Sequence, residues 1–165
     1  MQPDLTWSTK PFSKLSTDEL FDILKLRVDV FVVEQACYYP ELDEHDRHPE
    51  TLHFFAYINE KDNEAQPSNP IAAYLRILPK GTSYDNYISM GRVVVSPAYR
   101  GYKLGHLLLK KALEVCKTNF PGQSIKISAQ EHLEAYYQQY GFVTVSDMYL
   151  EDNIPHISML YKVEQ

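Results

Sequence analysis

Basic residues and glycines lie close together in the segment Arg100-Gly101-Tyr102-Lys103-Leu104-Gly105, where a predicted strand leads through a turn into a predicted helix. Backbone N–H groups at a helix start, together with the positive end of the helix dipole, bind anions. Arg100 and Lys103 add positive charge, and Gly101 and Gly105 let a ligand approach the main chain closely. The pattern indicates a turn suited to a pyrophosphate, although a simple strand-to-helix connection has the same features.

Tyrosines are the second group of candidates. Tyr136, Tyr137 and Tyr140 lie within five residues on a short predicted helix that Gly141 ends. A phenol with an ordinary pKa of about 10 is protonated at neutral pH and can donate a proton. The competing interpretation is that these rings only pack on the apolar side of the helix.

Carboxylates offer two candidates for a general base. Glu34 ends the first predicted helix and could draw a proton through water, but it could equally be a solvated residue at a helix end. Glu131 is the further candidate. A reacting group that is already deprotonated in small part would need no base at all.

The cysteines are not predicted to be nucleophiles. Cys116 lies on the apolar side of a predicted helix, which favours packed core. Cys37 lies in an acidic loop, where neighbouring carboxylates raise the pKa of a thiol.

Residues 43–48 read Asp-Glu-His-Asp-Arg-His, but they lack the spacing of a closed zinc or calcium site. We therefore expect no metal there, and interpret the segment as a solvated charged loop or a wall that attracts an amine. Three arginines in helix or strand patterns are expected to pair with aspartates across the fold. The arginines are Arg27, Arg76 and Arg92, and the aspartates are Asp29, Asp43 and Asp46.

The hydrophobic pattern predicts the elements that position these residues. Ser16 and Glu19 have the spacing of a capping box, so a helix should start there and end near Val33. An exposed hairpin loop is expected at Glu60–Pro70. The other expected elements are strands at His53–Asn59, Ile71–Leu78, Met90–Ser96, Ser124–Ala129, Phe142–Tyr149 and His156–Lys162, and helices at Leu104–Asn119 and Gln130–Tyr140. The order predicts one mixed sheet with helices on both faces.

Composition sets the outer limits. A chain of 165 residues is expected to form one domain, over residues 1–165. Lys and Arg number 16 against 22 Asp and Glu, and this net charge of −6 argues against nucleic-acid binding. No apolar run is long enough for a membrane helix, the start of the chain lacks a secretory pattern, and two cysteines form no disulfide framework. A cytoplasmic protein with no membrane partner is expected.

The strand–turn–helix segment resembles the acetyl-CoA-binding motif of the GNAT (GCN5-related) N-acetyltransferases, Arg/Gln-x-x-Gly-x-Gly/Ala. Lys103 departs from it, because the family usually has glycine there. Residues 136–142 resemble the family's helix that ends in Tyr-x-x-x-Gly-Phe, and Tyr137 matches its catalytic tyrosine. Residues 26–35, followed by Tyr39, Asp43 and Asp46, and the closing residues 150–159 resemble the ElaA-type subfamily, which more often has glycine at the position of Asn153.

The resemblance implies an α/β (mixed α+β) fold, with a central, mostly antiparallel twisted sheet of about six to seven strands. It also implies direct acetyl transfer from acetyl-CoA, as co-substrate, to a primary amine of a small molecule or peptide. The main chain of Val93 and Val95 would hold the pantetheine arm, and Tyr137 would act as general acid. The implied cofactor-binding residues are Val93, Val94, Val95, Arg100, Gly101, Tyr102, Lys103, Leu104, Gly105 and His106.

Two other classes of function stay open. A non-catalytic acyl-CoA-binding or sensing module would keep the fold, and the Lys103 departure favours it. A protein-interaction scaffold has only the aromatic loop at Tyr38 and Tyr39 in its favour. A homodimer is also among the expected states.

Overall fold

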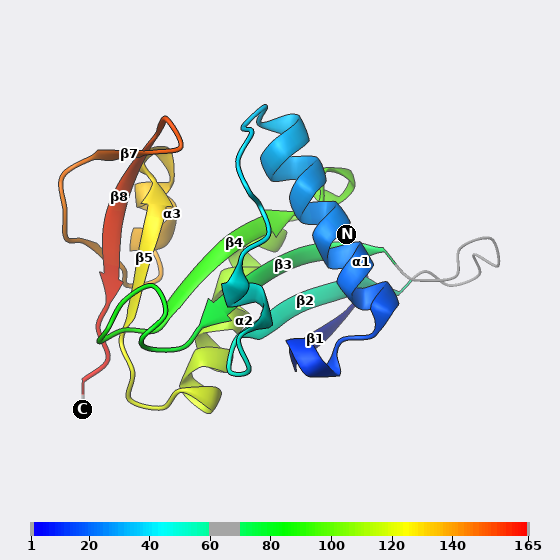
Figure 1. Cartoon of the computed structure of the whole chain (residues 1–165), viewed down its shortest axis with the longest axis horizontal. Coiled ribbons are helices and arrows are strands. Elements are labelled where there is room, and N and C mark those ends of the chain that lie inside the picture. Colours follow the sequence, from blue (N-terminus) through cyan, green and yellow to red (C-terminus); the bar gives the residue numbers. More distant parts are fainter. Residues whose placement is uncertain (1, 60–69, 165) are drawn as a thin grey trace. The chain divides into compact units, whose positions relative to one another are not determined.

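The computed structural model describes residues 2–59 and 70–164. Within them lie eight strands: β1 (Leu5–Pro11), β2 (Leu52–Ile58), β3 (Ile71–Leu78), β4 (Ser89–Val95), β5 (Ile125–Gln130), β6 (Val143–Thr144), β7 (Tyr149–Glu151) and β8 (Ile154–Tyr161). The α-helices are α1 (Thr17–Arg27), α2 (Leu104–Asn119) and α3 (Glu134–Gln138), as Figure 1 shows. None of the helices described is long and apolar enough to cross a membrane.

The chain forms two compact units. The first comprises residues up to Arg76 together with Arg92–Leu108, and the second comprises Ile77–Gly91 together with the chain from Leu109 onward. The prediction of one domain over residues 1–165 stays a prediction. Apart from Pro70, the predicted hairpin loop Glu60–Pro70 lies outside the described residues.

The first unit is built on a sheet with the strand order β1-β2-β3-β4. All eight residues of β3 are buried, and its sequence is apolar except for Arg76. The sequence pattern did not predict β1, which pairs antiparallel with β2 from Leu5 opposite Ile58 to Pro11 opposite Leu52. Its residues are only partly buried and it ends in proline, as suits an edge strand.

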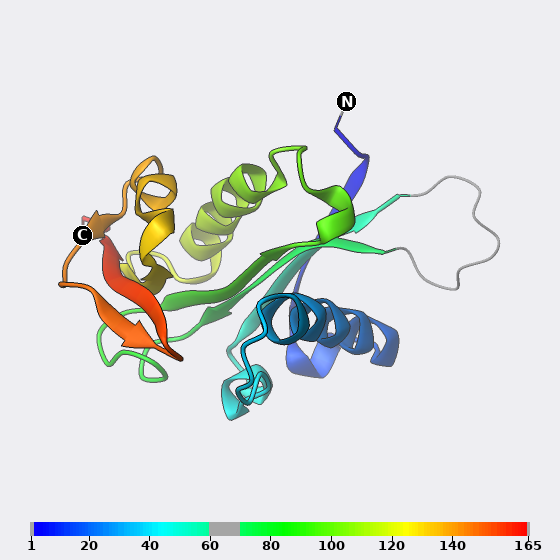
Figure 2. The ribbon, with the colours of Figure 1, turned by 90° about the horizontal axis from the view of Figure 1, so that it is seen from above.

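Both faces of this sheet are covered. Figure 2 shows α1 along one face. There Ile23 and Leu26 of α1 pack in one apolar cluster with Tyr74 and Val94 of the sheet. On the opposite face, Leu104 from the first turn of α2 packs with Ala72 and Ile58. The expectation of helices on both faces is confirmed for this sheet.

The start of α1 is also confirmed. The Glu19 backbone N–H donates to Ser16 Oγ (3.0 Å), and the Ser16 N–H donates to Glu19 Oε1 (2.9 Å), which completes the capping box. Beyond Arg27 the helix continues in π-helical form as η2 (Val28–Glu34). The predicted end near Val33 is therefore close to the observed one, but the last turns are wider than an α-helix.

The second unit holds a sheet with the order β5-β8-β6, and β7 pairs with β8. These pairs are antiparallel. The predicted strand Phe142–Tyr149 is wrong, because β6 and β7 are short strands separated by an irregular segment. Eight strands in two sheets replace the expected six to seven in one, while the mixed α/β class and the antiparallel pairing are as expected.

Candidate functional site

The predicted anion-binding turn lies between β4 and α2 in the first unit. A short 3-10 helix, η4 (Pro97–Tyr99), follows β4, and the exposed residues from Arg100 to Lys103 lead into α2. The Lys103 carbonyl accepts a hydrogen bond from the Leu107 N–H (3.3 Å), so the helical ladder starts here. Leu104 is only 2% exposed and anchors the first turn in the core. The start of a sixteen-residue helix thus faces an exposed basic turn.

Two residues of this turn have a left-handed backbone, and one of them is Lys103, which departs from the family motif. Lys103 has φ of +58° and Gly101 has φ of +93°. The left-handed region suits glycine and is uncommon for other residues. Lys103 therefore has a backbone conformation that favours glycine, and its ammonium adds positive charge to the same turn. An added Cβ at Gly101 would meet nothing within 4 Å, so the turn is open at that point.

Another left-handed residue lies within β4. Arg92 has φ of +53° in the middle of the strand. A left-handed residue within a strand is typical of a β-bulge, in which main-chain groups leave the regular ladder. Val93, Val94 and Val95 follow directly. The Val94 side chain is buried in the sheet core, as expected, whereas Val93 and Val95 are only partly buried.

Glu34 is paired with the turn. Arg100 Nη2 donates to Glu34 Oε1 (2.8 Å), and both side chains are roughly half-exposed, 48% and 44%. The structure thus brings the candidate base to a residue of the predicted cofactor turn. In this arrangement Glu34 neutralises and orients the Arg100 guanidinium, and one of its two carboxylate oxygens is occupied.

Three arginines form a largely buried network of ion pairs with three carboxylates, and two of the arginines belong to β3 and β4. Arg27 contacts Glu41 (2.8 Å) and Asp46 (2.7 Å). Arg76 contacts Asp43 (2.6 Å) and Asp46 (2.9 Å), and Arg92 contacts Glu41 (2.9 Å) and Asp43 (3.6 Å). The expected pairing of these arginines with Asp43 and Asp46 is observed. Asp29 is the exception, because it pairs with Lys25 on the helix surface.

Sequence reasoning missed Glu41. Its carboxylate is 2% exposed and joins Arg27 on α1 to Arg92 on β4. A single glutamate in a polar loop has no periodicity, so no sequence signal could have found it. The network fixes the loop from Glu41 to Asp46 against the sheet. Its ion pairs to Glu41 and Asp43 also hold the guanidinium of Arg92, whose backbone is left-handed.

Two arginines of the network stabilise the Asp46 anion. Burial on its own would raise its pKa, but hydrogen bonds and charge from Arg27 and Arg76 outweigh burial and lower the pKa to about 2. Asp43 and Asp46 thus both form ion pairs with arginines. Among residues 2–59 and 70–164, no group of three or more His, Cys, Asp or Glu side chains is arranged to hold a metal ion.

The two cysteines contribute no nucleophile to this geometry. Burial raises the pKa of the Cys116 thiol to about 12, so a thiolate there is strongly disfavoured. Cys37 is half-buried, and neither cysteine forms a disulfide within the described part of the chain.

Tyr137 lies on α3 in the second unit. The residue is 6% exposed. Its ring packs edge-on against the rings of Tyr136 and Phe142, with distances between ring centres of 4.9 Å and 5.6 Å. α3 ends at Gln138, before the predicted end at Tyr140, and Gly141 follows in a left-handed conformation with φ of +97°. Burial raises the pKa of Tyr137 to about 12, so the phenol stays protonated at neutral pH.

Comparison with known proteins identifies this arrangement. The model of the "Acetyltransferase (GNAT) domain" family matches residues 53–163, from β2 to the end of β8. The chain belongs to the GNAT family. Its GNAT match includes both the basic turn before α2 and the tyrosine helix α3, the two segments whose motifs carried the resemblance.

Similar GNAT-like proteins cover the chain almost completely. Protein ElaA of Escherichia coli is 37% identical over 161 residues, which is 98% of this chain and 99% of that protein. The crystal structure of Escherichia coli ElaA superposes with a TM-score of 0.85 over 96% of this chain and 100% of the other, at 36% identity. The crystal structure of an acyl-CoA N-acyltransferase from Pseudomonas aeruginosa superposes with a TM-score of 0.86. The match covers 95% of this chain and 99% of the other, at 41% identity.

Proposed function

We propose that this chain transfers an acetyl group from acetyl-CoA to a primary amine of a small molecule or peptide, by direct attack of the amine on the thioester. The observation that carries the proposal is the left-handed basic turn, Arg100 to Lys103, at the start of α2. It offers backbone N–H groups, a helix dipole and two cationic side chains to a diphosphate. The membership of the chain in the GNAT family supports the same ligand.

The remaining cofactor contacts are assigned to the segment after Arg92. In our proposal the main chain of Val93 and Val95 holds the pantetheine arm, and an N–H of this segment polarises the thioester carbonyl as negative charge develops on its oxygen. Tyr102, Leu104, Gly105 and His106 complete the turn around the diphosphate. The left-handed Arg92 supports this role, because a left-handed residue within a strand is typical of a bulge, which leaves main-chain groups outside the regular ladder.

Chemistry requires two further groups. The amine must be neutral when it attacks, and the departing CoA sulfur must be stabilised. We assign the second task to the Tyr137 hydroxyl, which burial keeps protonated. Glu34 is a weaker candidate for the first task, because it already pairs with Arg100.

A non-catalytic acyl-CoA-binding module is the alternative. The departure at Lys103 was the sequence feature in its favour, but φ of +58° places this lysine in the left-handed region that favours glycine, which weakens that argument. A cytoplasmic location is also part of the proposal, and it is supported by two cysteines that form no disulfide among the described residues.

The test is transfer itself. Purified protein is incubated with acetyl-CoA and each of a panel of polyamines, amino sugars, aminoglycosides and peptides with free N-termini. Thiol release and the mass of the amine product are followed together. We expect free CoA and acetylated amine in equal amounts with at least one class of amine. Tight acetyl-CoA binding without any product would favour the non-catalytic alternative.

A further inference from the structure

One face of β5 carries a polar surface in the second unit. Ile125, Ile127 and Ala129 point into the core, whereas Lys126 and Ser128 alternate with them and are only partly buried. Across the strand pair, Ser128 lies opposite Ser158 of β8. Amphipathic alternation of this kind usually leaves the outer face to solvent. Here the outer face is instead organised by hydrogen bonds.

Four side chains form a directed chain on that face. The Tyr149 hydroxyl lies 2.5 Å from Ser128 Oγ, and Ser128 Oγ donates to Glu151 Oε2 (3.3 Å). His156 Nε2 lies 3.2 Å from the same Glu151 oxygen. His156 Nδ1 contacts the Ile154 carbonyl oxygen (2.7 Å), and a carbonyl only accepts, so Nδ1 carries a hydrogen.

The Ser128 hydroxyl orients the Glu151 carboxylate, and part of the acceptor capacity of that carboxylate is unused by described residues. Both of its contacts with described residues, from Ser128 and from His156, reach the Oε2 atom. A carboxylate has about four acceptor sites on its two oxygens. The Glu151 side chain is 51% exposed, so Oε1 is available to a cation from solvent.

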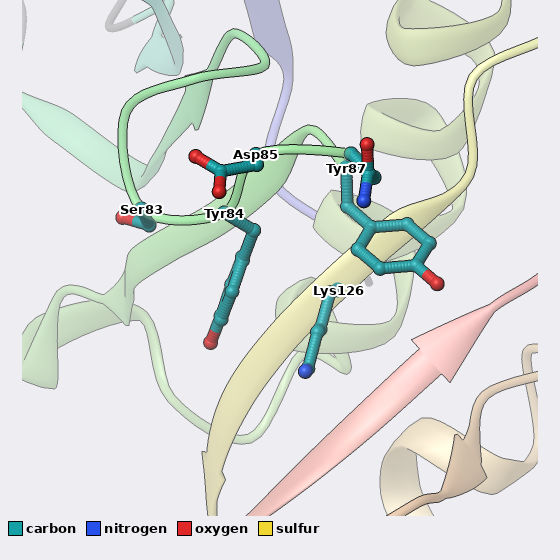
Figure 3. Close-up of a pocket in the computed structure, with 6 residues that line it drawn as sticks. Ser83, Tyr84, Asp85, Tyr87 and Lys126 are labelled. Atoms are coloured by element: carbon teal, nitrogen blue, oxygen red, sulfur yellow. The ribbon is translucent and has the colours of Figure 1, made fainter.

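A pocket adjoins this face at Lys126. Ser83, Tyr84, Asp85, Asn86, Tyr87 and Lys126 line it. Figure 3 shows Lys126 rising from β5 between the two tyrosines, with the Asp85 carboxylate turned away from it. The Lys126 ammonium lies 4.9 Å from the Tyr84 ring centre and 6.0 Å from that of Tyr87. No described carboxylate forms a salt bridge with it, so the pocket offers an ammonium group and two phenols.

The pocket and Glu151 belong to one surface. Lys126 and Ser128 are two residues apart on the same side of β5, which spaces them by ~7 Å along the strand. Burial first, and then Tyr149 and Glu151, raise the pKa of Tyr84, which agrees with a pocket wall that lies near these side chains. A cation and an anion therefore lie on one face with Ser128 between them.

We propose that this face is the acceptor subsite and selects an amine that also carries a carboxylate, with the carboxylate bound by Lys126 between Tyr84 and Tyr87 and the ammonium bound by Glu151. The inference rests on the proposed acetyl transfer for its role, and on the unit's own geometry for the ligand class.

The test uses ω-amino acids of two to six carbons, each beside its methyl ester, which keeps the amine and removes the negative charge. With acetyl-CoA in excess, kcat/KM for the best acid should exceed that of its ester by at least tenfold. Lys126→Gln should lower kcat/KM for the acid about tenfold and leave the ester unchanged. Lys110→Gln, at an exposed position of α2, is the matched control and should change neither.

Equal rates for acid and ester, or an equal loss for both in Lys126→Gln, would overturn the proposal while leaving acetyl transfer intact. If no amine supports turnover, binding decides. The ω-amino acid alone should then shift the backbone amide NMR signals of Lys126 and Ser128 in the wild type and not in Lys126→Gln. Shifts confined to other strands, or none at millimolar ligand, would equally overturn it.

Discussion

Replacing Tyr137 by phenylalanine should lower kcat for acetyl transfer by roughly 10²–10³, the usual size of a lost general-acid contribution. The substitution keeps the ring and its edge contacts with Tyr136 and Phe142, so the fold should be unaffected. The affinity for acetyl-CoA should change little, because the diphosphate contacts are assigned to the turn at Arg100–Lys103.

The raised pKa refines the role of this hydroxyl. Burial places the pKa of Tyr137 at about 12, whereas an ordinary thiol has a pKa of about 8.5. Complete proton transfer from such a phenol to a thiolate is uphill, so its main contribution is a hydrogen bond to the sulfur as charge develops. The Tyr137 hydroxyl donates to no other described residue, which leaves its proton for that task.

Tyr136→Phe is the matched control. Tyr136 neighbours Tyr137 on α3, and burial raises its pKa too, but it matches no catalytic position of the family motif. Steady-state kinetics on both variants should show a large fall in kcat for Tyr137→Phe and little change for Tyr136→Phe. Small and equal effects would make Tyr137 a packing residue and leave the departing sulfur to water.

Asp46→Asn should destabilise the fold by roughly 3 kcal/mol, because loss of one partner leaves buried arginine charge uncompensated. Asp46 contacts both Arg27 and Arg76, whose side chains are 0% and 5% exposed. Urea unfolding followed by circular dichroism measures the change. Glu44→Gln is the control, since the Glu44–Arg47 pair lies at the surface and its loss should hardly move the midpoint.

The same carboxylate predicts a pH dependence. The pKa of Asp46 falls from an ordinary 3.8 to about 2 on folding. A lowered pKa means that the stabilisation is fully present above about pH 4 and is lost as the pH falls through about 2. Wild-type stability should therefore decline between these values, and the decline should be smaller in Asp46→Asn. Identical acid unfolding profiles would contradict this account of the network.

Local patterns made much of the fold predictable. The capping box at Ser16 and the helix Leu104–Asn119 depend on residues close in the chain, and both appear in the structure. β1 was missed because an edge strand that is half polar and ends in proline has a weak pattern. The irregular segment between β6 and β7 was missed because scattered apolar residues resembled a strand.

The site was predictable only where a motif is contiguous. The turn at Arg100–Gly105 and the helix of Tyr137 are such motifs. Glu41 and the group around Ser128, Glu151 and His156 come from loops and strands far apart in sequence, and only tertiary structure brings them together. The left-handed φ of Lys103 is likewise a property of the folded turn.

Titration calorimetry with acetyl-CoA tests the central claim most directly. The account predicts one site per chain in the wild type, affinity within about tenfold in Lys103→Gly, where backbone donors remain, and no measurable binding in Gly105→Asp, where a side chain and a negative charge oppose the diphosphate. Acetyl-CoA that gives no heat and no thermal shift with the wild type, or that binds Gly105→Asp as tightly, would contradict the assignment of this turn as the cofactor site.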